Sequence, residues 1–155
     1  MAIDFGSSVN FSNNGVTRLS APSTGGVRLG NQPIFIGTFN LYTTATSNFA
    51  PTLTTYTAQN VTINAGNTTI TVPTTGLYYI HAQQLINSST AIYLSIFKNG
   101  VEQKCAYVVN GNTYDMVVGG VFSLNAGDVI SFYYAGTLTY GWNGAHSSVF
   151  LYLIG

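Results

Sequence analysis

The chain has 155 residues, and its four Lys or Arg residues balance four Asp or Glu residues, so only 5% of it is charged. Ordinary globular proteins carry about 25% charged residues, and nucleic-acid binding depends on clustered Lys and Arg that neutralise phosphates. This composition therefore excludes nucleic acid as a partner. Because no stretch approaches about 18 consecutive apolar residues, it also predicts no membrane insertion.

The N-terminus and the cysteine content predict where the protein matures. The first six residues (MAIDFG) contain neither a basic segment nor an apolar one, so no secretory signal is expected. Cys105 stands alone, which rules out an internal disulfide framework. We therefore expect the protein to fold and assemble in the cytoplasm.

Residues 1–33 are predicted to form an extended N-terminal anchoring arm. They are rich in Gly, Ser and Asn and sparse in apolar residues, so alone they cannot bury enough apolar surface to offset the entropy lost on ordering. Two similar fragments, GVTRL and GVRL, recur within this segment, either by chance in a low-complexity sequence or as part of an extended arm that orders only against a partner. We expect the arm to become ordered against a neighbouring subunit or another protein through Phe5, Phe11, Arg18 and Arg28.

From residue 34 onward, short strands separated by turn signals predict an all-β domain over residues 34–155. The Asn-Gly pairs at 99–100 and 110–111 favour tight hairpins, and the segments 64–67 and 125–128 separate further strands. Eight to ten strands at this spacing indicate a β-sandwich or jelly roll. The predicted strands are 34–42, 61–64, 68–72, 77–83, 91–97, 103–109, 116–124, 129–134 and 148–154.

The predicted strands fall into two groups by their hydrophobic pattern. Strands 61–64 and 68–72 alternate apolar and polar residues, which is typical of a sheet with one solvated face. Strands 91–97, 129–134 and 148–154 alternate poorly, and the last is apolar at six consecutive positions. Such strands need two dry surfaces, and we expect the second surface to come from another copy of the protein.

Within the poorly alternating strands, one side is mainly aliphatic and the other mainly aromatic. We assign the aliphatic side to the sandwich core. Tyrosine suits an interface because its ring can be buried while its hydroxyl finds a partner or water. The predicted subunit interface consists of Tyr93, Phe97, Tyr133, Phe150 and Tyr152.

Catalytic or metal chemistry is poorly supported, and we expect neither enzymatic activity nor a cofactor. The four carboxylates are scattered, whereas acid–base catalysis needs paired carboxylates or an oriented His. His81 and His146 are too isolated to form a metal site. His81 is expected to be an ordinary strand residue beside Tyr79, and Cys105 a half-buried structural thiol.

One loop suits ligand recognition. Tyr140, Trp142, Asn143 and His146 combine aromatic rings with polar groups that could hold a sugar. The alternative is that Trp142 simply packs the loop that precedes the last strand.

Four segments resemble, in order, motifs of the complement globular-head and tumour-necrosis-factor jelly-roll superfamily. Residues 69–80 (TITVPTTGLYYI) resemble its strand, Pro, x, x, Gly, x, Tyr, Tyr, Phe signature, and 94–100 (LSIFKNG) resemble its Lys-Asn-Gly hairpin. Residues 121–130 (VFSLNAGDVI) resemble its Gly-Asp turn. Residues 148–153 (SVFLYL) resemble its closing strand, with Phe-Leu-Tyr-Leu in place of the usual Phe-x-Gly-Phe.

This resemblance implies a ten-stranded jelly roll that forms homotrimers, with the closing strand near the three-fold axis and no catalysis. The low charge and the Gly/Ser/Asn-rich arm also resemble bacteriophage virion proteins. We therefore expect a capsid decoration or cement protein on the virion surface whose arm binds the major capsid protein or another virion protein. The alternative is the receptor- or glycan-binding head of a phage fibre, with a host-surface glycan as its ligand.

Overall fold

The computed structural model describes residues 9–13, 16–21, 28–29, 32–40, 49–88, 90–108, 112–142 and 144–155. The chain divides into two compact units, Met1–Gln32 and Pro33–Gly155. Among the described residues, no helix is long and apolar enough to cross a membrane.

The N-terminal unit contains three short strands. β1 (Val9–Asn13), β2 (Val16–Ala21) and β3 (Arg28–Leu29) form an antiparallel sheet in the order β1-β2-β3. The sequence predicts an extended arm here, whereas the described strands pair with one another. Phe11 lies in β1, Arg18 in β2 and Arg28 in β3, while Phe5 lies outside the described residues.

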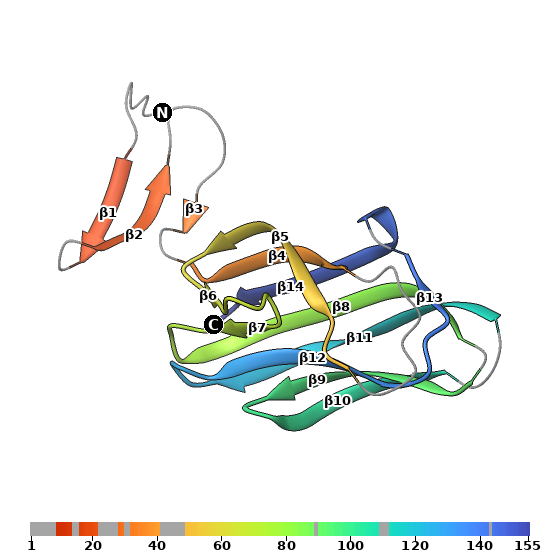
Figure 1. The fold of residues 1–155 in the computed structure, drawn as a ribbon. Helices are drawn as coiled ribbons and strands as arrows, with labels where there is room; N and C mark the ends of the chain where they lie inside the picture. Colours follow the sequence, from red (N-terminus) through yellow and green to blue (C-terminus); the bar gives the residue numbers. More distant parts are fainter. Residues whose placement is uncertain are drawn as a thin grey trace. The chain divides into compact units, whose positions relative to one another are not determined.

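The second unit is a jelly-roll sandwich of two antiparallel sheets (Figure 1). The first sheet comprises β4 (Ile34–Asn40), β5 (Thr52–Gln59), β8 (Gly76–Ser88), β11 (Asn112–Leu124) and β14 (Ser147–Leu153), with the short β13 (Tyr140–Gly141) paired to β8. The second comprises β6 (Thr62–Ile63), β7 (Thr69–Thr71), β9 (Ile92–Lys98), β10 (Val101–Val108) and β12 (Val129–Gly136). Their orders are β11-β8-β14-β4-β5 and β10-β9-β12-β7-β6. The two main sheets supply eleven strands among the described residues, ten of them in these two orders, where the sequence predicts a ten-stranded jelly roll.

The core lies between the sheets and follows the two-residue period of the strands. On β8, Tyr78, Ile80 and Ala82 are fully buried, while the alternate residues point outward. The expected aliphatic core is confirmed, and Leu153 packs at its margin. The buried members of that set are Ile92, Leu94, Ile96, Ile130, Phe132, Val149 and Leu151.

Two features of the sheets differ from the sequence expectation. β5 has no counterpart among the predicted strands. It lies at the edge of its sheet, and only Leu53 of its threonine-rich sequence (TLTTYTAQ) is buried in the core, so it lacks a hydrophobic pattern. The strand grouping by pattern is also wrong, since β6 and β7 belong to the same sheet as β9 and β12. The hydrophobic pattern of a strand reflects how much of its outer face is shielded from solvent. This shielding differs between strands of one sheet, so the pattern does not show which sheet a strand belongs to.

The turn between β9 and β10 is the expected Asn-Gly hairpin, and it is tied to the 125–128 turn. Asn99 and Gly100 have φ values of 51° and 78°, the left-handed region that this pair tolerates. The carboxylate of Asp128 accepts hydrogen bonds from the Asn125 N–H at 2.7 Å and Asn99 Nδ2 at 2.7 Å, and forms an ion pair with Lys98 Nζ at 2.9 Å. These contacts, the Asn125 N–H foremost, lower the pKa of Asp128 from 3.8 to about 2.

Replacing Asp128 with Ala is expected to lower the free energy of unfolding by about 2–3 kcal/mol, because three donors lose a charged acceptor. Since folding lowers the pKa of Asp128, its stabilising effect is complete above pH 3.8 and declines as the pH falls toward about 2. Chemical unfolding across this pH range measures both effects. The matched control is Asp115→Ala, which removes an exposed carboxylate that accepts from Gln83 Nε2 at 2.8 Å. Equal losses for the two variants would contradict the prediction.

Candidate functional site

The outer face of the first sheet carries a cluster of four aromatic side chains from two adjacent strands. β8 supplies Tyr79 and His81, and β14 supplies Tyr152 and Phe150 directly opposite them in the antiparallel register. The ring centroids of Tyr79 and Tyr152 lie 5.4 Å apart, and those of His81 and Phe150 lie 5.7 Å apart. Tyr79 and His81 also stack, with centroids 6.4 Å apart. We call these four residues the aromatic face.

The surface around the aromatic face is apolar and shallowly hollowed. An open depression of about 380 Å³ lies over the four rings. A second depression of about 340 Å³ adjoins it at Phe150 and is lined in part by Ile36 and Tyr56. The large apolar side chains exposed on this sheet and its C-terminal extension are Ile36, Tyr56, Leu77, Val117, Val121, Tyr140, Tyr152 and Ile154.

Charge is nearly absent from this surface. Among the described outward residues of the first sheet, only Asp115 is charged, and it is hydrogen-bonded to Gln83. Soluble monomers rarely expose a broad contiguous apolar patch, and such patches mark sites of association. Aromatic enrichment with depletion of charge is the composition of an interface core. The outer face of the first sheet is therefore the strongest candidate site among the described residues.

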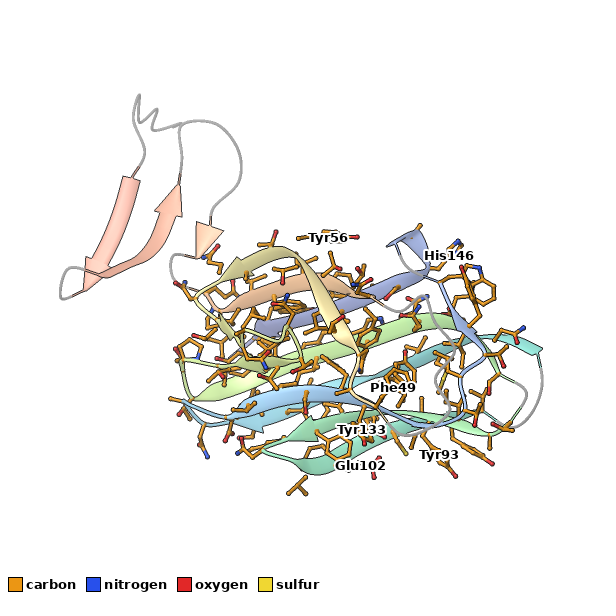
Figure 2. All side chains as sticks on the ribbon, in the orientation of Figure 1. Phe49, Tyr56, Tyr93, Glu102, Tyr133 and His146 are labelled. Atoms are coloured by element: carbon orange, nitrogen blue, oxygen red, sulfur yellow. The ribbon has the colours of Figure 1, made fainter. Side chains whose placement is uncertain are left out.

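The structure divides the predicted interface between the two sheets. Phe150 and Tyr152 belong to the aromatic face, whereas Tyr93, Phe97 and Tyr133 lie on the outer side of the second sheet. Figure 2 shows Tyr56 beside the first sheet and Tyr93 and Tyr133 on the opposite side of the sandwich. The expectation that all five share one surface is therefore wrong. Alternation along a strand assigns each residue to one of two faces but does not identify the sheet.

The outer side of the second sheet has its own ring contacts and is more polar. The centroids of Tyr93 and Tyr107 lie 4.5 Å apart, and those of Phe97 and Tyr133 lie 5.6 Å apart. Between these pairs, the buried Ser95 donates a 2.5 Å hydrogen bond from its hydroxyl to Oε1 of Glu102. Cys105, opposite Ser95 in the register, is exposed, so its expected half-burial is wrong.

Tyr79 and His81 were not assigned to the interface by the sequence. The expectation that His81 shares a face with Tyr79 is confirmed by their stacked rings. Tyr79 lies in the segment 69–80 that resembles the family motif, and His81 follows it directly. Their alternation with Tyr78 and Ile80 is also typical of an ordinary strand with one solvated face, so it does not indicate an interface. Only the pairing of β8 with the closing strand places them beside Phe150 and Tyr152.

The loop before β14 is held against β8 by its backbone. The Trp142 N–H donates to the Leu85 carbonyl at 3.0 Å, and Gln84 Nε2 donates to the Trp142 carbonyl. The rings of Tyr140 and Trp142 pack edge to face with centroids 4.7 Å apart. His146 ends the short 3-10 helix Gly144–His146 and is exposed, as Figure 2 shows, whereas Asn143 lies outside the described residues. The structure thus brings Tyr140 and Trp142 together.

Within the part of the chain that the structure describes, no group of three or more His, Cys, Asp or Glu side chains is placed to hold a metal ion. The hydrogen bonds of two carboxylates stabilise the fold. Asp128 accepts a hydrogen bond within its own turn, and Glu102 accepts one from the Ser95 hydroxyl.

Comparison with known proteins gives similarity in structure alone. No protein-family model matches the chain, and no curated protein matches it in sequence. Eiger TNF from S. frugiperda superposes with a TM-score of 0.67 and 13% identity over 81% of this chain and 94% of that one. Murine APRIL, in a crystal structure at pH 5.0, superposes with a TM-score of 0.66 and 13% identity over 79% of this chain and 99% of that one. These matches confirm the tumour-necrosis-factor-like jelly roll.

Proposed function

We propose that the protein is a non-enzymatic homotrimer in which three copies bury their aromatic faces around a shared axis. The observation that carries this proposal is the exposed aromatic and aliphatic surface of the first sheet, which bears a single carboxylate among its described residues. Burying such a surface contributes about 25 cal/mol per Å² of apolar area, and few charges must be desolvated. Association of identical copies fits because the same patch is present on each chain.

The sandwich geometry decides which predicted residues join this interface. Only one outer side of each sandwich can face a common axis, so Phe150 and Tyr152 turn inward with Tyr79 and His81. Tyr93, Phe97 and Tyr133 then lie on the outside of the assembly, where the exposed carboxylate of Glu102 remains hydrated. The proposed trimer therefore keeps two of the five residues expected from the sequence.

The biological setting that we propose is the surface of a bacteriophage virion. A decoration or cement protein needs a compact assembled head, a segment that contacts the capsid and no catalytic centre. The jelly roll supplies the head, and the N-terminal unit, with Phe5, Phe11, Arg18 and Arg28, is assigned to contact the major capsid protein. The low charge of the chain supports a structural role.

The mass of the intact chain in solution tests the assembly. Native mass spectrometry at neutral pH is expected to give the mass of three 16.5 kDa chains, and a stable, soluble monomer would contradict the proposal. Quantitative mass spectrometry of purified particles tests the setting. A copy number comparable with that of the capsid protein supports decoration, a few copies per particle indicate a fibre tip, and absence from particles contradicts a virion role.

The ordered pair of Tyr140 and Trp142 favours a second candidate function, that of a glycan-binding head. Trp142→Ala is expected to lower the free energy of unfolding by about 1–2 kcal/mol, since the edge-to-face pair and its buried area are lost. Trimer mass should be unchanged, because the loop is fixed to β8 through backbone groups. A glycan-array or host-cell binding assay that compares the wild type with this folded variant tests the second function. It is contradicted if the variant binds as well as the wild type, or if the wild type does not bind at all.

A further inference from the structure

His81 is a titratable group at the centre of an otherwise apolar surface. Its ring stacks on both Phe150 and Tyr79, and its cross-strand neighbour on β11 is Gly119, which brings no side chain. A Cβ at position 119 would lie 2.8 Å from the Ile80 carbonyl oxygen, so this site excludes a larger residue. The imidazole is therefore accessible from the β11 side, where only a molecule that binds the outer face of the sheet can cover it.

The groups around His81 offer little compensation for a positive charge. On β8 and β14 its neighbours are Tyr79, Gln83, Phe150 and Tyr152, all uncharged near neutral pH. Asp115, the only described carboxylate on this face, pairs with Leu85 in the register and is bound by Gln83. From β10, the ammonium group of Lys104 donates a 2.5 Å hydrogen bond to the Gly119 carbonyl, but it lies on the Gly120 side of β11, 3.3 Å from where a Gly120 Cβ would be, and so on the other face of the strand.

Few groups in this chain change charge between about pH 5 and pH 7.5. Ordinary carboxylates titrate below this range and Lys and Tyr above it, so the candidates are the two histidines, with the terminal amine at the upper limit. His146 is exposed on the short helix before β14 and is not part of the aromatic face. We therefore assign any pH dependence of association through the aromatic face in this range to His81.

We propose that His81 makes the assembly acid-labile: neutral imidazoles permit the aromatic faces to associate, and protonated imidazoles separate the subunits. This inference rests on the proposed trimer. Closing the interface would place three imidazoliums near one axis and away from water, while Asp115, the only described carboxylate on each face, is already bound by Gln83. Burying an unpaired charge is strongly unfavourable, so association requires the neutral form.

The expected size of the effect follows from the number of copies. Protonation that leaves about one imidazole in ten neutral lowers association about tenfold for each copy. If all three copies must be neutral, the trimerisation constant falls by up to about a thousandfold between neutral pH and about pH 5.5. Asp128 keeps its full stabilising effect above pH 3.8, so its turn is not weakened within this range.

The test is sedimentation velocity of the full chain at a fixed protomer concentration, from about pH 7.5 to about pH 5. The wild type is expected to sediment as a trimer at the upper limit and to dissociate into folded monomers, with unchanged Trp142 fluorescence, at the lower. His81→Phe keeps an aromatic ring without a titratable nitrogen, and we expect it to stay assembled throughout. His81→Gln provides a second neutral variant with the same expectation, and His81→Lys should be dissociated at every pH.

The matched control is His146→Phe, which should dissociate at the same pH as the wild type. A wild-type trimer that persists at the lowest pH contradicts the role of His81 but leaves the trimer intact. Acid dissociation of His81→Phe and His81→Gln at the wild-type pH also contradicts it. A wild-type monomer at neutral pH contradicts the proposed function itself, so the two failures are distinguishable.

Discussion

Tyr152→Asp is expected to convert the proposed trimer into monomers. In the assembled protein the new carboxylate would be desolvated against the aromatic faces of neighbouring copies, where the described residues include no Lys or Arg to pair with it. We expect association to weaken by at least about a hundredfold, because burying an unpaired charge costs several kcal/mol. Native mass spectrometry at neutral pH, with protomer concentration varied, measures the change.

Tyr93→Asp is the matched control for this variant. In the isolated chain Tyr93 is 40% exposed and Tyr152 is 38% exposed, and each lies on an outward strand position beside another tyrosine ring. Both substitutions should therefore affect the subunit fold to a similar extent. Only the variant on the first sheet should lose the trimer, and loss of the trimer in Tyr93→Asp alone would reverse the assignment of the interface.

Phe39→Ala is expected to give the largest loss of subunit stability. Phe39 is fully buried, and its ring packs edge to face against Phe132 at 5.4 Å and Tyr134 at 5.9 Å between centroids. Its truncation leaves a cavity at the centre of the sandwich and should lower the free energy of unfolding by about 3–5 kcal/mol. That is a large part of the 5–15 kcal/mol that typical domains possess.

Urea unfolding at equal protomer concentration measures this loss, because association also adds to apparent stability. Phe39→Leu, which retains most of the apolar volume, is the control and should cost less than about 1.5 kcal/mol. A loss below about 1 kcal/mol for Phe39→Ala would show that the two sheets do not meet at this residue as described.

The sequence could predict the fold class because the signals for strands and turns are local. The Asn99-Gly100 pair takes the left-handed conformation that closes its hairpin, and the aliphatic residues of strand 91–97 occupy the core. The same local rules could not predict β5, whose threonine-rich edge buries only Leu53. Nor could they predict that β8 continues to Ser88, because Gln84 is a buried residue that binds the backbone of a distant loop.

The candidate site was only partly predictable from the sequence. Alternation identified Phe150 and Tyr152 as residues that need a second covering surface, and the structure places them on the outer side of the first sheet. It also grouped them with Tyr93, which the strand order assigns to the other sheet. The contribution of His81 depends on the non-local pairing of β8 with β14, which no local pattern specifies.

Oxidative footprinting of tyrosine side chains in the intact protein at neutral pH tests the central claim most directly. Tyr79 and Tyr152 are expected to be protected from hydroxyl radicals, while Tyr93 and Tyr107, exposed to a similar degree or more in the isolated chain, react fast. Dilution to dissociating concentrations, or the Tyr152→Asp substitution, should then expose Tyr79. Oxidation of Tyr79 and Tyr152 in the intact protein as fast as that of Tyr93 and Tyr107 would contradict burial of the aromatic face between copies.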